Sequence, residues 1–285
     1  MTSSLSAAPL CPVCGAEPRG APPISGHSML RCPACSLVYA RNREVPADLY
    51  ETAYSAQGDY GAKLSFAREL REGTASFDWS HSWVLDQVRP YGQRRALDLG
   101  CGVGAALYLA GKAGWSPHGQ DISENALRVA REVFGCVTYS ESIEQLAARG
   151  EKFELITAFH LVEHLPQPLA YLQTVRKLLA DGGYFGVVVP NYDSYAMRYT
   201  HCAEWLPPFH LNFFTLASLR NALGRAGLRI ITHKTKIASW RGIEGPKYKR
   251  YVLLPYLVAN GLIHRLRGNI IVTLCQGNHD QSRAG

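Results

Sequence analysis

The stretch LDLGCGVG, residues 97–104, decides the fold of this chain. An apolar run ends there in three glycines at alternate positions, a pattern typical of a backbone that turns tightly against a ligand at the end of a strand. With Ala105 it also fits the dinucleotide-binding pattern G-x-G-x-x-[GA], although loosely. No G-K-[ST] follows, so the stretch is not a P-loop. The loop therefore predicts a nucleotide-like ligand, whose charge the neighbouring residues must indicate.

Asp98, two residues before the first glycine, indicates that charge. A carboxylate at this position would repel a pyrophosphate, whereas it suits a cationic ligand. S-adenosylmethionine carries a sulfonium and an ammonium group, so Asp98 favours this cofactor. Asp121 ends the next predicted strand and is placed to accept ribose hydroxyls from either kind of nucleoside. Cys101 lies in the tight turn with no base near it in sequence, so we expect a small loop residue and not a nucleophile.

Strands and helices alternate after Tyr91, which predicts a parallel sheet covered by helices on both faces. We expect Ser123 to cap a helix that runs to Phe134. The predicted strands are 95–99, 115–122, 136–140, 153–160, 184–190, 228–236 and 269–276, and the predicted helices are 103–113, 123–134, 168–180 and 215–226. The fold class is therefore α/β and Rossmann-like.

Four successive motifs resemble those of class I S-adenosylmethionine-dependent methyltransferases: ALDLGCGVGAAL, GQDIS, FELITAFHLVEHLPQP and LLADGGYFGVVVPN. The likeness covers roughly residues 91–235, and residues 269–276 are similar to the last, antiparallel strand of that seven-stranded sheet. The resemblance implies a loop that cradles the methionine moiety, an acid on the ribose, and further residues along the adenine and near the methyl group. The implied cofactor residues are Asp98, Gly100, Cys101, Gly102, Gly104, Asp121, Ile122, Ser142, Ile143, Phe159 and His160.

Methyl transfer by direct displacement requires an aligned acceptor and, for a hydroxyl or carbon acceptor, a group that removes a proton. Candidate catalytic residues follow the fourth and fifth predicted strands, at the sheet edge where ligands bind. They are His160, Glu163 and His164 in FHLVEH, and His210 in FHLNFFT. The second phrase resembles a substrate-side element of small-molecule and sugar methyltransferases. The alternative for His210 is a hydrogen bond that anchors its loop, and for Glu163 and His164 the favoured interpretation is a structural or orienting role.

Four cysteines near the N-terminus predict a metal site. Cys11, Cys14, Cys32 and Cys35 have the spacing C-x2-C-x17-C-x2-C, which closes a tetrahedral zinc site with four thiolates. Such a site has no open coordination position, so the zinc would be structural. We expect SLVYA, residues 36–40, to be a strand that packs this ribbon onto the rest. A ribbon of this kind before the catalytic domain resembles sugar and natural-product methyltransferases.

Three regions follow from these assignments: a zinc ribbon at 1–45, a helical linker or cap at 46–90, and a methyltransferase domain at 91–285 with an insertion at 240–267. Tyrosines of the cap either pack in its core or close over a ligand. The insertion is either a lid or core-facing helix, or an interfacial helix whose 247–267 segment docks on an anionic membrane. The residues concerned are Tyr50, Tyr54 and Tyr60 in the cap, and Lys247, Lys249, Arg250, Arg265 and Arg267 around the apolar part of the insertion.

Composition narrows the functional classes. With 47% hydrophobic and 19% charged residues, the chain is not disordered throughout. The N-terminus has no secretory pattern and no apolar run could span a bilayer, so we expect a cytoplasmic protein. The favoured function is methylation of a small molecule, namely a sugar, a quinone-like compound or a secondary metabolite, at oxygen or carbon.

Three other functions stay open. A formal charge of +7 permits a ribosomal RNA methyltransferase that uses the ribbon to bind RNA, although no basic run and no [ND]-P-P-[YF] phrase supports it. The second is a membrane-docked enzyme acting on a lipid-linked intermediate. The third is a non-catalytic protein that keeps the cofactor fold as a scaffold.

Overall fold

The computed structural model describes residues 8–46, 49, 60–76, 79–90, 94–194, 206–236 and 270–277. The predicted insertion at 240–267 lies outside the described residues, as do Tyr50 and Tyr54. For Tyr60, only the backbone is described.

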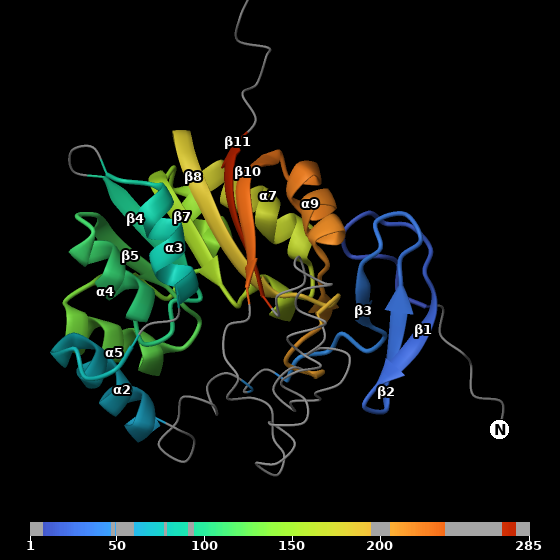
Figure 1. Cartoon of the computed structure of the whole chain (residues 1–285), viewed down its shortest axis with the longest axis horizontal. Coiled ribbons are helices and arrows are strands. Elements are labelled where there is room, and N and C mark those ends of the chain that lie inside the picture. Colours follow the sequence, from blue (N-terminus) through green and yellow to red (C-terminus); the bar gives the residue numbers. More distant parts are fainter. Residues whose placement is uncertain are drawn as a thin grey trace, which may run out of the picture.

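A seven-stranded sheet forms the centre of the molecule (Figure 1), in the order β10-β11-β8-β7-β4-β5-β6. β4 pairs in parallel with both β5 and β7, while β11 runs antiparallel to β8 and β10. The predicted α/β sheet and its antiparallel last strand are therefore confirmed. The strands are β4 Arg95–Leu99, β5 Ser116–Gln120, β6 Val137–Tyr139, β7 Phe153–Phe159, β8 Leu179–Pro190, β10 Leu228–Lys236 and β11 Ile270–Gly277.

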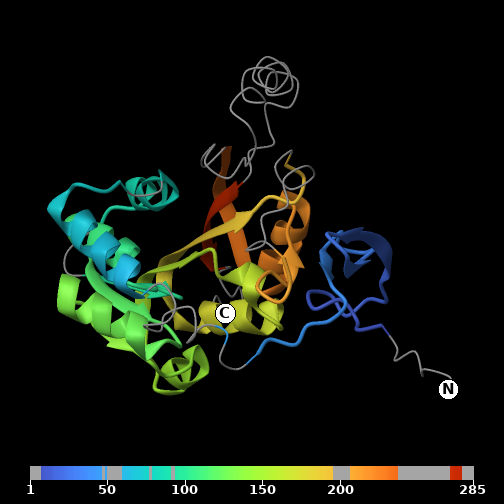
Figure 2. The same cartoon turned by 90° about the horizontal axis from the view of Figure 1, so that it is seen from below.

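Helices cover both faces of this sheet (Figure 2). On one face α3 packs against β11 and α4, α4 packs against α5, and α2 lies on α5. On the other face α7 lies between α6 and α9. The helices are α2 Tyr60–Glu72, α3 Trp79–Gln87, α4 Ala105–Lys112, α5 Glu124–Phe134, α6 Ile143–Ala148, α7 Pro168–Leu178 and α9 Leu216–Arg225, with a 3-10 turn η1 at Val162–His164.

Local capping explains where several of these helices begin and end. Ser123 accepts a hydrogen bond from the Ala126 N–H and caps α5, as predicted. α4 starts two residues later than predicted, because Gly104 at its N-cap has a φ of 91°. α6 was not predicted from the sequence, since it is only six residues long, and Ser142 begins it with a capping box. α7 ends two residues earlier than predicted because β8 already begins at Leu179.

The N-terminal ribbon is a second sheet beside the α7–α9 side of the molecule (Figures 1 and 2), in the order β1-β2-β3-β9. β3 confirms the strand predicted in SLVYA, and it pairs with β9, which lies far from it in the sequence. The two sheets share an apolar core, because Leu37 and Tyr39 of the ribbon lie in one buried cluster with Val162 and Phe214. The strands are β1 Arg19–Ile24, β2 His27–Arg31, β3 Val38–Ala40 and β9 Asn212–Phe213.

Candidate functional site

The turn from β4 to α4 needs glycine at alternate positions. Gly100, Gly102 and Gly104 have φ angles of 64°, 51° and 91°, a region that residues with a side chain rarely adopt. A Cβ on Gly100 would lie 3.0 Å from Leu161 Cδ1, and a Cβ on Gly104 would lie 3.0 Å from Ala130 Cβ. Side chains at these two positions would collide with Leu161 and Ala130, so the turn presents its backbone alone, which is the form expected of a cofactor loop.

Asp98 lies just before this turn and is almost fully buried, with 5% of its surface exposed. Its Oδ1 accepts a hydrogen bond of 2.7 Å from Thr157 Oγ1 on β7. Burial raises the pKa of Asp98 to about 7, an effect that the Thr157 hydrogen bond opposes and the charge of Asp121 reinforces. A buried carboxyl that ionises near neutral pH is stabilised as a charge when a cation binds beside it.

A small cavity of about 10 Å³ lies beside Asp98, with room for about one water molecule. Its walls come from α3, β4, α4 and β7, and His81 on α3 and Phe159 on β7 are among them. The two rings lie with their centroids 4.1 Å apart. The sequence carries no signal for His81, because nothing in the pattern of α3 indicates which of its residues lines the cavity beside Asp98.

Asp121, just after β5, contacts the loop after β4 at the place where the ribose of the cofactor is expected. Its Oδ2 accepts from the Gly102 N–H and its Oδ1 from the Ser123 N–H, each at 2.9 Å. The neighbouring Ile122 is 64% exposed, so its apolar side chain is open to a planar ring. By contrast, the Ser142 hydroxyl caps α6 and the side chain of Ile143 packs in the main core. Both side chains thus make contacts within the protein, which leaves the backbone at residues 142–143 to contact an adenine edge.

Cys101 packs into the protein and not toward the loop opening. It belongs to a buried cluster with Leu107, Leu127, Ala130 and Cys136, under α4 and α5. A Cβ placed on Gly119 would lie 2.7 Å from Cys101 Sγ, so the thiol rests directly on β5. Burial raises the pKa of Cys101 well above its usual value. These contacts agree with the expectation that Cys101 is not a nucleophile.

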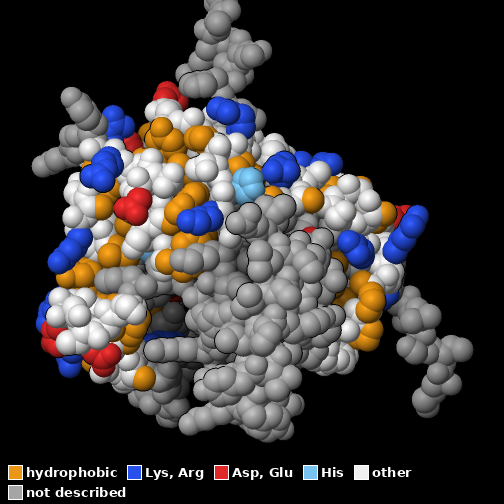
Figure 3. All heavy atoms as spheres, viewed as in Figure 1, with side chains coloured by type: hydrophobic (Ala, Val, Ile, Leu, Met, Phe, Trp, Pro, Cys, Tyr) orange, Lys and Arg blue, Asp and Glu red, His pale blue; other side chains and the backbone are white. Residues whose placement is uncertain are grey.

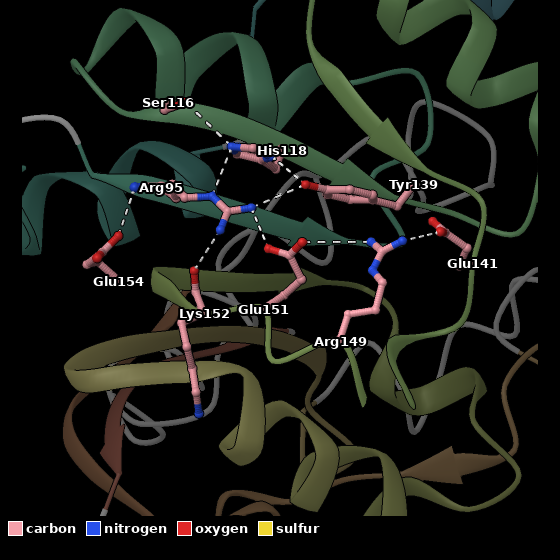
Figure 4. Close-up of polar contacts among 9 residues, drawn as sticks. All are labelled: Arg95, Ser116, His118, Tyr139, Glu141, Arg149, Glu151, Lys152 and Glu154. Atoms are coloured by element: carbon pink, nitrogen blue, oxygen red, sulfur yellow. Dashed lines mark hydrogen bonds and ion pairs between the residues drawn. The ribbon is translucent and has the colours of Figure 1, made fainter. Parts of the chain in front are cut away.

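A polar network ties the amino ends of β4 and β5 to the end of β6 (Figure 4). Arg95 donates to Tyr139 Oη at 3.2 Å and pairs with Glu151 at 2.8 Å, and His118 Nδ1 lies 3.0 Å from the same Tyr139 oxygen. Burial and the charge of Arg95 lower the pKa of His118, which favours the neutral ring. Tyr139 is the last residue of β6. The network therefore holds the start of the loop that leads to Ser142.

The four candidate catalytic residues meet at the carboxyl edge of β7. His160 follows β7 with a φ of 54°, unusual for a residue other than glycine, and its side chain is 42% exposed. Its Nδ1 lies 3.3 Å from Oε1 of Glu163, which is only 1% exposed. This contact is not a well-aligned hydrogen bond, since neither Glu163 oxygen has a hydrogen-bond partner among the described residues.

The charges around Glu163 decide its ionisation. Burial raises its pKa, but the contact with His160 and the charges of His164, His160 and His210 outweigh burial, so the pKa of Glu163 is lowered. His164 Nδ1 lies 2.9 Å from the Phe209 carbonyl oxygen and must donate to it, because a carbonyl only accepts. The His210 ring lies edge-on to His164 with the centroids 4.6 Å apart. Burial lowers the pKa of His210 to about 4.

Two groups of side chains have the arrangement that could hold a metal ion. The Sγ atoms of Cys11 and Cys35 are 3.5 Å apart, those of Cys14 and Cys32 are 3.3 Å apart, and all four lie within 4.8 Å of one another. A tetrahedral zinc with Zn–S bonds of about 2.3 Å separates its sulfurs by about 3.8 Å, so the four cysteines fit zinc. The donor atoms of Glu163, His164 and His210 also lie within 4.8 Å of one another.

The sequence of this chain matches a known protein family. Residues 56–233, more than half of the chain, match the family described as "Methyltransferase domain". The chain belongs to this methyltransferase family. Within the described residues, no helix combines the length and the apolar character needed to cross a bilayer.

Relatives of this methyltransferase include enzymes of quinone biosynthesis. The ubiquinone biosynthesis O-methyltransferase of Ruegeria pomeroyi is 33% identical over 163 residues, which are 53% of this chain and 66% of the relative. That of Parvibaculum lavamentivorans is 28% identical over 181 residues, which are 59% of this chain and 69% of the relative. The match to the Ruegeria enzyme thus spans slightly less than two thirds of its length.

Solved structures share the fold. A chain of the complex between the Haloferax volcanii Trm112 methyltransferase activator and a methyltransferase superposes with a TM-score of 0.56 at 18% identity, covering 76% of this chain and 98% of that chain. The S-adenosylmethionine-dependent methyltransferase from Mesorhizobium loti has a TM-score of 0.50 at 20% identity, covering 69% of this chain and 97% of that chain. The sheet predicted from the four motifs is therefore the methyltransferase fold.

Proposed function

We propose that this protein transfers the methyl group of S-adenosylmethionine to a hydroxyl oxygen of a small, quinone-like aromatic acceptor. The observation that carries the proposal is the pair formed by half-exposed His160 and buried Glu163 at the carboxyl edge of β7. An O-methyltransferase for a phenolic hydroxyl benefits from a base at this edge, where the cofactor's methyl group is expected. The O-methyltransferases among the relatives support the same acceptor class.

The cofactor supplies the methyl group, and residues of this chain would bind and orient it. Asp98 beside the glycine turn offers a negative charge to the sulfonium and ammonium end. Asp121 would accept from the ribose hydroxyls, and exposed Ile122 would cover one face of the adenine. His81 and Phe159, which line the cavity next to Asp98, would shape the methionine end.

In the proposed reaction, His160 removes the acceptor's hydroxyl proton as the oxygen attacks the methyl carbon. The O–CH₃ bond forms while the S–CH₃ bond breaks, and the sulfur keeps the bonding electrons and loses its positive charge. Glu163 orients the imidazole and stabilises its positive charge after proton transfer, as a carboxylate does beside a catalytic histidine. His210 is a poor base at neutral pH, because its burial disfavours the protonated ring.

We also propose that the four cysteines hold a structural zinc ion and that the chain is organised as a ribbon at 1–45, a cap at 46–90 and a catalytic domain at 91–285. Four thiolates leave the metal no open position, so the ion would contribute to folding and not to the methyl transfer.

The Lys and Arg side chains described on the face in Figure 3 are scattered among apolar and uncharged ones. Tracking an RNA backbone would need a band of such charges, which the described side chains on that face do not form.

The test is methylation of a soluble catechol, protocatechuate, with labelled S-adenosylmethionine, compared with an activated sugar and a ribosomal RNA fragment. We expect the catechol to be labelled, and we expect His160→Gln and Glu163→Gln to lower kcat by about 10²-fold or more. His233→Gln on β10 and Glu132→Gln on α5 are matched controls, since both side chains are exposed and away from the site. Labelling of RNA or sugar alone, or full activity of His160→Gln, would contradict the proposal.

A further inference from the structure

The ribbon and the candidate catalytic residues are joined by a short segment around β9. The Ala40 N–H at the end of β3 donates to the Leu211 carbonyl oxygen at 2.9 Å. On the other side, the Leu211 N–H donates to the Glu163 carbonyl oxygen, also at 2.9 Å. Leu211, the neighbour of His210, is therefore bonded to the ribbon on one side and to the 3-10 turn that carries Glu163 on the other.

Asn212 extends this link with its side chain, which is 1% exposed. Its amide nitrogen lies 3.3 Å from the Val162 oxygen, 3.3 Å from the Glu163 oxygen and 2.7 Å from the Leu165 oxygen, all of them backbone carbonyls. Two of these carbonyls also accept a backbone N–H, since Leu165 donates to Val162 at 3.4 Å and Leu211 donates to Glu163 at 2.9 Å. The Asn212 amide adds to these bonds and also reaches the Leu165 carbonyl, and so fixes the turn against β9.

Arg43 reaches the same place from the ribbon, three residues after β3. Its Nη1 donates to the Leu211 carbonyl oxygen at 3.2 Å, and its Nη2 donates to the Leu165 and Pro166 carbonyl oxygens at 3.2 and 2.7 Å. The same Nη2 lies 3.0 Å from Asn212 Oδ1, which turns the Asn212 nitrogen toward the 3-10 turn. A planar guanidinium can serve acceptors from both segments at once, which a lysine ammonium on its flexible stem does less well.

The position of Arg43 depends in turn on the ribbon's own fold. Its guanidinium lies 5.6 Å from the ring centre of Tyr39 on β3. Tyr39 belongs to the buried cluster that also contains Cys11, Cys32 and Cys35. The four-cysteine site and β3, against which Arg43 lies, therefore belong to one packed core.

We propose that Arg43 is a positioning residue for the candidate catalytic centre: through β9 and Asn212, the ribbon holds the 3-10 turn that carries Glu163 and His164, and so places Glu163 beside His160. The catalytic meaning of this placement rests on the function proposed above. His164 already shares this dependence, because its Nδ1 donates to the Phe209 carbonyl on the same segment. The ribbon therefore contributes to the geometry of turnover as well as to folding.

The experiment compares Arg43→Lys with Arg31→Lys, a matched control on β2 whose side chain is exposed. We expect Arg43→Lys to lower kcat by about tenfold or more while the Kd for S-adenosylmethionine stays unchanged, because misplaced groups slow the chemical step. Addition of guanidinium to Arg43→Ala should restore part of kcat. Unchanged kcat in Arg43→Lys, or equal losses in Arg31→Lys, would overturn the proposal.

Hydrogen–deuterium exchange gives a readout that does not depend on methylation. In Arg43→Lys, amides of residues 161–166 and 206–213 should exchange faster, while those of the loop at 98–104 keep the wild-type rate. No change in the first two segments would overturn the proposal, as would faster exchange over the whole chain. If the wild-type protein methylates no acceptor, the proposed function fails, and exchange alone still decides whether Arg43 holds the two segments together.

Discussion

Asp98 gives the most specific test of how the cofactor is held. Its carboxyl has a pKa of about 7 in the free protein, against 3.8 for an ordinary aspartate, because it is buried. Binding of a cation beside it favours the ionised form, so the proton must leave when the cofactor binds at lower pH. At pH 6 about ten molecules in eleven carry the proton, and the apparent Kd for S-adenosylmethionine should be about tenfold weaker than at pH 8.

The sign of the stability effect follows from the same pKa. Between about pH 4 and 7 the folded protein keeps the Asp98 carboxyl protonated, whereas the unfolded chain has already released this proton. Burial of Asp98 therefore lowers the free energy of unfolding progressively as the pH rises through this range. A shift of about three pKa units corresponds to roughly 4 kcal/mol. Asp98→Asn should therefore stabilise the free protein at pH 8 by up to about 4 kcal/mol and have little effect at pH 4. Binding should change in the opposite direction, with weaker cofactor affinity at pH 8.

Isothermal titration calorimetry from pH 6 to 8, in two buffers of different ionisation enthalpy, measures both the affinity and the proton release. The cofactor's own amine titrates close to this range, so the effect is the difference between wild type and Asp98→Asn. Asp86→Asn, at an exposed position on α3, is the matched control. The reasoning is refuted if Asp98→Asn keeps the wild-type pH dependence, or if it lowers stability equally at pH 5 and pH 8.

Two other predictions concern the ribbon and the packing under the glycine turn. Elemental analysis should find about one zinc per chain, and Cys32→Ser should lose it together with a marked drop in Tm, because a four-thiolate zinc contributes directly to folding; full stability after zinc removal would contradict a structural metal. Gly119→Ala should lower the free energy of unfolding by about 1–3 kcal/mol, since its Cβ would lie 2.7 Å from Cys101 Sγ and from Leu107 Cδ1. The double variant Gly119→Ala with Cys101→Ala should recover part of that loss, measured by chemical denaturation. If the losses of the two single variants simply add in the double variant, the new Cβ does not clash with Cys101.

Much of the fold was predictable because its signals are local. The apolar run before the glycines, the acids at the ends of β4 and β5, and the cap at Ser123 each depend on residues a few positions apart. The sheet and its helices followed from these signals. The C-x2-C spacing placed the four cysteines together for the same reason. Short elements were missed: α6 has six residues and β9 two, too few for a periodic pattern.

The candidate site was predictable in its members but not in its arrangement. FHLVEH and FHLNFFT supplied the four candidate residues, yet only the folded chain pairs half-exposed His160 with buried Glu163 and buries His210 beside His164. The same is true of His81, which reaches the Asp98 cavity from a helix before the first strand of the main sheet.

The sequence by itself determined the methyltransferase sheet, the glycine turn and the four-cysteine ribbon, because each is written in short-range spacing. Tertiary structure alone decided how the ribbon meets the catalytic edge. Arg43 and Asn212 are 169 residues apart, and their contact exists only because β3 and β9 pair. No local pattern encodes such a contact, since its energy comes from acceptors that the rest of the fold brings within reach.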